Sequence, residues 1–296
     1  MQVFVTGATG WVGSAVVQDL LAAGHRVRGL ARAEDKARTL AASGAQAVRG
    51  TLDDLALLRS EAERADAVVH TAFNHDFSKF AENAAQDRLA IEALGEALGG
   101  SGRPLVVTSG LAMLAPGRVA TEHDLPQDGP AYPRRSEATA RLLAARGVHA
   151  TTVRLAPSVH GRGDHGFIPI LIGIARASGV SAYVGDGANR WPAVHRSDAA
   201  TLYRLVLEKG ATEPAYHAVA EEGIAFRQIA EAIGAALGLP VVSRDSAHFG
   251  WFASFAAADM PASSAHTRAA LGWQAHGATL LADIAHAGYA DAATRG

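Results

Sequence analysis

The sequence predicts an α/β fold with a doubly wound parallel sheet, and three observations support this prediction. Short apolar runs alternate with segments of helical periodicity over the first half of the chain. A glycine or a polar turn closes each apolar run. The first run leads directly into Gly7, Gly10 and Gly13, and a helix-like pattern follows. Because strict alternation of strand and helix requires crossover connections, the strands should be parallel and covered by helices on both faces.

The expected elements follow one another in regular order over residues 1–155. Each expected strand is a short apolar run, and each expected helix has apolar residues at helical spacing. The strands are expected at residues 2–6, 26–30, 46–49, 67–71, 104–108 and 151–155. The helices are expected at residues 11–23, 34–43, 53–64, 78–100 and 133–146.

The glycine-rich turn after the first strand is typical of a dinucleotide-binding site. Three glycines let the chain reverse tightly, bring backbone N–H groups close to a pyrophosphate and pack the next helix against the strand. The N-terminus of that helix then faces the phosphates. A purely structural glycine turn is the alternative. The first candidate cofactor-binding residues are Gly7, Thr9, Gly10, Trp11, Val12 and Gly13.

The regular alternation ends near residue 156, which predicts a second, smaller lobe. Loops are expected at residues 161–166 and 183–187, with a helix between them. A further strand near 215–219 and a helix near 226–236 suggest that the chain interleaves between the lobes. We therefore expect a nucleotide-binding domain over residues 1–155 and a partly interleaved substrate lobe over residues 156–296.

The end of the second strand should distinguish NADP from NAD. A carboxylate there would bind the ribose 2′-hydroxyl of NAD. Instead the strand ends in Ala31 and Arg32, with Arg28 and Lys36 nearby. An arginine can hold the 2′-phosphate of NADP through two charge-assisted hydrogen bonds. We therefore expect NADP (NADPH) rather than NAD, although these cations could also belong to a solvated helix start.

Further candidate cofactor contacts follow the third and fourth strands, because ligands bind at the carboxyl ends of strands in open α/β sheets. Two residues after the third strand are expected near the adenine, and three after the fourth are expected near the phosphates and ribose. These residues are Leu52, Asp53, Thr71, Ala72 and Phe73.

The chain resembles the extended short-chain dehydrogenase/reductases, a family that includes NAD(P)-dependent epimerases and dehydratases. Residues 6–13 (TGATGWVG) match its TGxxGxxG fingerprint. Residues 107–109 resemble its active-site serine strand, and residues 153–161 resemble its segment beside the nicotinamide. Residues 194–198 and 267–273 match two further family segments. The resemblance covers nearly the whole chain and implies a Rossmann-type fold.

The resemblance also implies a set of functional residues. Thr108 and Pro157 join the candidate cofactor contacts, because they lie in the matching segments. Homodimers that pair through the helices near 78–100 and 133–146 are expected on the same ground.

The standard catalytic set of the family is incomplete here. The family uses a tyrosine as proton donor, a lysine four residues later that lowers the pKa of the tyrosine and holds the ribose, and a serine or threonine that binds the substrate oxygen. Ser109 and Tyr132 match two of these positions, but the third is Ser136. A neutral serine cannot bring a phenol from its ordinary pKa of about 10 towards neutrality. Arg135, on the same turn, is a candidate for part of that electrostatic role.

Alternatives remain open for each catalytic candidate. Tyr132 could be the proton donor, a hydroxyl of the substrate pocket or a structural residue at a helix start. Ser109 could bind the substrate oxygen or cap a turn. His75 lies in a loop after the fourth strand, and a histidine near its ordinary pKa can donate a proton at pH 7. His160 and His165 are weaker candidates for the same task.

The composition limits the classes of function. A net charge of −2, with both signs interspersed, provides no field for nucleic acid or an anionic membrane. The chain has no cysteine, so disulfides and thiol catalysis are excluded. The histidine spacing matches no metal motif, and we expect no metal. No signal peptide or membrane span is expected, and these features suit a cytoplasmic protein that binds a small molecule.

The principal hypothesis is an NADPH-dependent oxidoreductase that acts on a small, largely apolar carbonyl or related compound. The aromatic segment at residues 248–255 would line an apolar pocket or pack in the core. Arg162, Arg176 and Arg190 are not clustered in the sequence, which argues against a sugar-nucleotide substrate. The alternatives are an NADP-binding regulator or sensor without turnover, and an epimerase or isomerase that recycles its cofactor.

Overall fold

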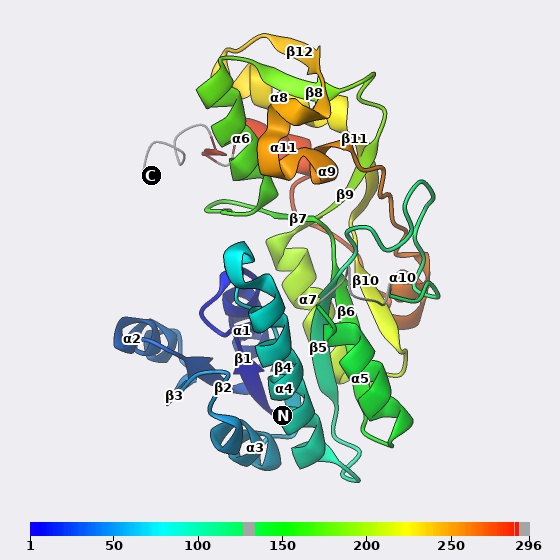
Figure 1. The fold of residues 1–296 in the computed structure, drawn as a ribbon. Coiled ribbons are helices and arrows are strands. Elements are labelled where there is room, and N and C mark those ends of the chain that lie inside the picture. Colours follow the sequence, from blue (N-terminus) through cyan, green and yellow to red (C-terminus); the bar gives the residue numbers. More distant parts are fainter. Residues whose placement is uncertain (127–133, 287, 290–296) are drawn as a thin grey trace. The chain divides into compact units, whose positions relative to one another are not determined.

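The computed structural model describes residues 1–126, 134–286 and 288–289, and the chain divides into two compact units (Figure 1). The first unit combines three segments, which are Met1–Ser109, Leu125–Arg154 and Ala199–Tyr216. The second unit combines the other three, which are Gly110–Asp124, Leu155–Asp198 and His217–Gly296. Within the described residues, no helix has both the length and the apolar character needed to cross a membrane.

A seven-stranded sheet with the order β10-β6-β5-β4-β1-β2-β3 forms the centre of the first unit. β1 pairs in parallel with both β2 and β4, so the strand order reverses on either side of β1. Ligands bind at such a switch point, beyond the carboxyl ends of the strands. The strands are β1 (Gln2–Thr6), β2 (Arg26–Ala31), β3 (Gln46–Arg49), β4 (Ala67–His70), β5 (Leu105–Gly110), β6 (Ala150–Leu155) and β10 (Ala215–Ala218).

Helices cover both faces of this sheet. α3, α4 and α5 pack side by side on one face, while α1 and α7 lie on the other, where Arg204 of α7 bonds Asp19 of α1 (Figure 1). Coverage on both faces explains why β1 and β4 are continuous apolar runs rather than alternating ones. The helices are α1 (Trp11–Ala22), α2 (Glu34–Ala42), α3 (Leu55–Arg64), α4 (Phe80–Leu98), α5 (Ser136–Ala145) and α7 (Arg196–Glu208).

The doubly wound α/β fold predicted from the sequence is confirmed, and the first six strands and five helices occur in the expected order. One difference is at the start of α4, which was expected near residue 78 and is found at Phe80. The Asp76 carboxylate accepts hydrogen bonds from the backbone N–H and hydroxyl of Ser78 and caps a short 3-10 turn, Phe77–Lys79, before α4 begins. α5 begins at Ser136, three residues after the expected start.

The second unit contains two small sheets and its own core. One sheet has the order β11-β9-β7 and the other pairs β12 with β8. Its strands are β7 (Ser158–His160), β8 (Ser181–Val184), β9 (Arg190–His195), β11 (Glu221–Ala225) and β12 (Val241–Arg244). Its helices are α6 (Phe167–Ser178), α8 (Phe226–Leu237), α9 (Ala253–Ala257), α10 (Ala265–Leu271) and α11 (Leu280–His286), with a 3-10 segment η2 (Ser246–Phe252).

The sequence analysis located α6, α8 and β10 but missed the five strands of the second unit. These strands are three to six residues long, and two of them are largely exposed or half-buried. β9 also contains Pro192, which argues against a strand on sequence grounds.

Replacement of Gly13 by alanine should destabilise the protein by about 2 kcal/mol or more, because a Cβ there would lie 2.1 Å from the backbone oxygen of Gly7. Gly173 on α6 is the matched control, since a Cβ there meets no atom within 4 Å. Gly173→Ala should be neutral or stabilising by up to about 1 kcal/mol. Urea unfolding measures both changes, and equal stability of the two variants would contradict the prediction.

Candidate cofactor and active site

The glycine turn packs tightly against the residues that follow β4. Gly7 has a φ of +66°, and a Cβ there would lie 2.6 Å from the backbone nitrogen of Ala72. A Cβ at Gly13 would lie 2.6 Å from Thr71 Oγ1. The turn is closed by the N–H of Gly10, which donates to the oxygen of Gly7 at 2.8 Å. These glycines are therefore required by close backbone approach within the protein itself.

The N-terminus of α1 has no side-chain cap. Gly10 caps the helix without a side-chain hydrogen bond, and no acidic residue lies in the first turn. The first N–H groups of a helix have no intrahelical acceptor, and the helix dipole favours an anion beside them. Thr9, Trp11 and Val12 lie around this turn and are partly buried. The glycine turn and the helix start thus fit the pyrophosphate of a dinucleotide.

Arg32, directly after β2, is exposed and forms no ion pair within the described residues. Arg28 is already engaged, because its Nη2 donates to Glu61 Oε1 at 2.8 Å and its Nε donates to Glu61 Oε2. The hydrogen bond with Glu61 also raises the pKa of Arg28. Glu34, two residues along the chain from Arg32, is paired with Arg49. Arg32, with the exposed Lys36, is therefore the group at this strand end that can receive an anion.

The ends of β3 and β4 lie along the same edge of the sheet. Asp53 accepts a hydrogen bond from the Gln86 side chain at 2.8 Å, and Leu52 beside it is partly buried. The Thr71 hydroxyl donates to the oxygen of Thr6 at 2.8 Å, which ties the end of β4 to β1. Ala72 is partly buried and contacts the glycine turn, as described above.

Thr108 and Ser109 lie at the carboxyl end of β5 and have different surroundings. The Thr108 hydroxyl shares a hydrogen bond of 2.6 Å with the hydroxyl of Tyr203 on α7. Burial raises the pKa of Tyr203 well above its ordinary value, so this phenol stays protonated. Ser109 is only partly buried, and its hydroxyl has no hydrogen bond to the described residues. Ser109 is thus the hydroxyl at this strand end that a ligand could reach.

A chain of buried polar groups joins β1, β4, α4 and α5. The Ser136 hydroxyl donates to Asp87 Oδ2 at 2.5 Å, and Asp87 Oδ1 lies 3.0 Å from His70 Nε2. His70 Nδ1 lies 2.8 Å from the hydroxyl of Thr6. Thr6 is 0% exposed, and the other three residues are 1% exposed. We call Thr6, His70, Asp87 and Ser136 the buried polar chain.

The sequence analysis did not single out His70 or Asp87. A signal was present for Asp87, because it lies on the apolar stripe of α4 with Ala84, Ala90 and Ile91. A buried carboxylate is stable only when it is paired and hydrogen-bonded, so an acid on such a stripe indicates a polar partner. The identity of the partner depends on which strand the helix covers, and periodicity does not reveal it.

Arg134, rather than Arg135, lies in the site. Its Nε donates to Ser136 Oγ at 3.0 Å, and its Nη2 donates to the backbone oxygen of Thr108 at 3.2 Å. The guanidinium carbon lies 4.1 Å from the centre of the Phe73 ring. Burial lowers the pKa of the Arg134 guanidinium, and the nearby Asp87 carboxylate opposes this shift. Arg135 is exposed, and its part in the electrostatic role beside Tyr132, which lies outside the described residues, stays a prediction.

The remaining catalytic and cofactor candidates are Tyr132, His75 and Pro157. Tyr132 lies outside the described residues. His75 is exposed in the loop after β4, and its ring packs edge-on against Phe73 at 5.2 Å. Pro157 belongs to the second unit, where it lies between β6 and β7 and is partly buried.

Two histidines of the second unit were also considered as acids or bases. His160 is buried, with Nδ1 2.6 Å from Asp283 Oδ2, and burial lowers its pKa. The neutral ring is therefore favoured. His165 is exposed. Among the residues that the structure describes, no group of three or more His, Asp or Glu side chains could hold a metal ion.

The aromatic segment at residues 248–255 contributes mainly to the core of the second unit. Phe249 and Phe252 are buried there, and Phe252 stacks on Phe255 with ring centres 5.5 Å apart. Trp251 is the exception, because it is 63% exposed. It lies at a hollow of about 380 Å³ lined also by Ile174, Ala177, Ser178, His248, Phe249 and Gly250.

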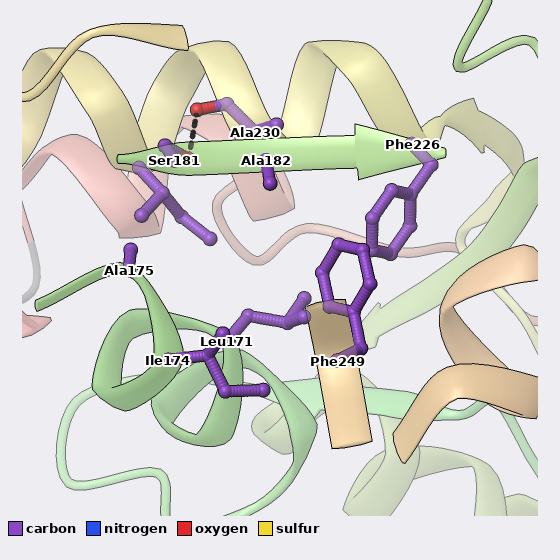
Figure 2. A pocket seen from close by; sticks show the side chains of 9 residues that line it. Leu171, Ile174, Ala175, Ser181, Ala182, Phe226, Ala230 and Phe249 are labelled. Atoms are coloured by element: carbon purple, nitrogen blue, oxygen red, sulfur yellow. Dashed lines mark hydrogen bonds between the residues drawn. The ribbon is translucent and has the colours of Figure 1, made fainter. Parts of the chain in front are cut away.

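A closed cavity in the same core is too small for a substrate. Its volume is about 10 Å³, which holds one water molecule at most, whereas small-molecule sites measure hundreds of Å³. Figure 2 shows its apolar lining, with Leu171 and Ile174 on one side and Phe226 and Phe249 beside them. The Ser181 hydroxyl donates to the oxygen of Ala230 at 2.7 Å and is thereby satisfied (Figure 2).

Comparison with known proteins identifies the family of the chain. Residues 3–220 match the profile of the NAD dependent epimerase/dehydratase family. The chain belongs to this family. The resemblance to the extended short-chain dehydrogenase/reductases inferred from the glycine fingerprint and the later segments is therefore confirmed.

Individual known proteins show different degrees of similarity to this chain. An uncharacterized protein of Schizosaccharomyces pombe is 48% identical over 296 residues, which cover 98% of this chain and 100% of that protein. A 4-hydroxy-2-methyl-3-oxo-4-farnesyl-3,4-dihydroquinoline-1-oxide ketoreductase of Stigmatella aurantiaca is 34% identical over 60% of this chain and 55% of that protein. The solved UDP-glucose 4-epimerase of Thermus thermophilus has the same fold, with a TM-score of 0.73 at 21% identity over 100% of this chain and 99% of that one.

Removal of the Asp87 carboxylate should destabilise the protein strongly. Asp87→Ala leaves His70 and Ser136 buried without their partner, which should cost about 3 kcal/mol. Glu82→Ala is the matched control on α4, because Glu82 is exposed, and its cost should stay below about 1 kcal/mol. Chemical denaturation distinguishes the two, and a loss at Asp87 no larger than that at Glu82 would disprove the proposed role of the buried polar chain.

Proposed function

We propose that the protein is an NADPH-dependent oxidoreductase that acts on a small, largely apolar carbonyl compound. The observation that carries the cofactor preference is the exposed, unpaired Arg32 at the end of β2, where an NAD-specific site would have a carboxylate. The neighbouring Glu34 is paired with Arg49 and does not compete for Arg32. A dianionic 2′-phosphate would complement this guanidinium.

Two observations support an apolar carbonyl substrate. One is the name of a relative, and the other is an ion pair that engages Arg190 in the second unit. The Stigmatella aurantiaca relative is named as a ketoreductase whose substrate carries a farnesyl group. Arg190 is held by Asp259 through Nε and Nη2, at 3.0 and 2.8 Å. This guanidinium is thus engaged already and is a poor partner for the phosphates of a sugar nucleotide.

The residues of this chain would position the reactants and handle the proton. NADPH supplies the hydride when it is bound. Ser109, with a hydroxyl that the described residues do not occupy, would bind the carbonyl oxygen of the substrate. Tyr132 would donate the proton that completes the alcohol, and His75 is the alternative donor.

A second candidate function is a protein without turnover. It is favoured by Ser136, which stands at the position where the family has its lysine. A protein that binds NADPH and catalyses no turnover would act as a regulator or sensor. An epimerase or isomerase would instead retain its cofactor through purification and return it to its starting redox state. Both alternatives predict NADPH binding and differ from the main proposal in their consumption of NADPH.

The cofactor preference can be tested by charge reversal at Arg32. Arg32→Glu should weaken NADPH binding tenfold or more, because about two charge-assisted hydrogen bonds are lost, and should leave NADH binding within about threefold. Arg26→Glu is the matched control, since Arg26 is an exposed arginine at the opposite end of the same strand. Fluorescence titration gives both affinities. Equal losses in the two variants, or an unchanged preference in Arg32→Glu, would overturn the NADPH assignment.

The reaction class can be tested with a panel of ketones, aldehydes and enones. The wild-type protein should oxidise NADPH in the presence of at least one apolar ketone, as followed at the nicotinamide absorbance. Ser109→Ala should then lower kcat/KM by a factor of 10² or more without changing NADPH affinity. NADPH binding with no turnover on any member of the panel would favour the regulator.

A further inference from the structure

We propose that Arg134 is the cation that binds the sugar–phosphate part of the cofactor, in place of the lysine that is absent at position 136. This inference rests on the proposed function and identifies the residue that performs one of its steps. Arg134 stands two residues before Ser136 in the sequence. Its guanidinium nevertheless reaches the edge of the sheet where the strands β4 and β5 end.

The location of the guanidinium is the first argument. It contacts the backbone oxygen of Thr108 on β5 and lies over the ring of Phe73, three residues after the end of β4. Both neighbours lie at carboxyl ends of strands: β4 is next to β1 at the switch point, and β5 is next to β4. Open α/β sheets bind their ligands at this edge. The charge therefore lies on the side of the sheet that also bears the glycine turn after β1.

The unused hydrogen-bonding capacity of Arg134 is the second argument. A guanidinium carries five N–H donors. Nε donates to Ser136 and Nη2 donates to Thr108, while Nη1 has no acceptor in the described part of the chain. No carboxylate there forms a direct ion pair with Arg134, since Asp87 is reached only through Ser136. A partly buried cation with remaining donors is well suited to ribose hydroxyls or a phosphate.

The support beneath Arg134 is the third argument. Ser136 accepts from Arg134 Nε and donates to Asp87, which His70 contacts from the other side. The arginine is thus held by the buried polar chain, and its orientation is fixed before any ligand arrives. Ser136 therefore links the Arg134 guanidinium to the buried Asp87 carboxylate.

A purely structural role for Arg134, as a clamp between β5 and α5, is the competing explanation. Such a clamp would affect stability and leave the affinity for NADPH unchanged. The test therefore measures NADPH affinity by fluorescence in the absence of any carbonyl substrate, with melting temperature recorded in parallel. This readout does not depend on turnover.

Five variants separate the explanations, the fifth being Arg135→Met at the neighbouring position. Arg134→Met and Arg134→Gln both remove the positive charge. The glutamine side chain keeps an amide N–H that can donate to the backbone oxygen of Thr108, so Arg134→Gln is expected to keep the fold. Each should raise the Kd for NADPH tenfold or more. Arg134→Lys, which keeps the charge, should restore the Kd to within about threefold. Arg141→Met is the matched control on α5, because Arg141 is exposed, and its Kd should stay within twofold.

The outcomes are distinguishable from failure of the proposed function. If the neutral variants melt lower but bind NADPH like the wild type, Arg134 is a clamp and the inference is overturned. If Arg135→Met causes the same loss as Arg134→Met, the charge has been assigned to the wrong residue. If the wild type binds neither NADPH nor NADH, the proposed function fails, and the inference fails with it. If the wild type binds and only the Arg134 variants lose affinity, the inference holds whether or not a substrate is found.

Discussion

The buried carboxylate of Asp87 is the constraint on which the rest of the site depends. A charge inside a protein must be paired and hydrogen-bonded, and here His70 and Ser136 occupy the two carboxylate oxygens. These contacts join α4 to β4 and to the start of α5, and His70 extends the chain to Thr6 on β1. Because α5 is fixed through its first residue, Arg134 just before it is directed towards the ends of β4 and β5.

The glycine turn and the end of β4 form one packed unit rather than two independent loops. The Thr71 hydroxyl bonds the oxygen of Thr6, and no Cβ fits at Gly7 or Gly13 without contact to this segment. The first turn of α1 carries no acidic side chain and no side-chain cap. A dinucleotide phosphate can therefore meet backbone donors of α1 directly, while Arg32 and Arg134 provide charges at two other strand ends along the same edge.

Much of the first unit was predictable from the sequence, because continuous apolar runs such as residues 67–70 must be buried on both faces. The strands of the second unit were not predictable from the sequence, because β12 is largely exposed and β9 contains Pro192. For the site, the glycine positions followed from backbone requirements alone. The sequence did not indicate which of Arg134 and Arg135 contacts the strand ends. Both residues precede the first helical residue of α5, so helical periodicity does not apply to them.

A crystal structure of the protein with NADPH tests the central claim most directly, because it shows both proposed charge contacts at once. The proposed arrangement predicts the 2′-phosphate within hydrogen-bonding distance of Arg32, the pyrophosphate at the N-terminus of α1, and a ribose hydroxyl or phosphate oxygen on Arg134. A complex in which the dinucleotide lies at this edge without contact to either arginine would contradict the cofactor preference and the further inference. NADPH bound elsewhere on the protein would contradict the whole site.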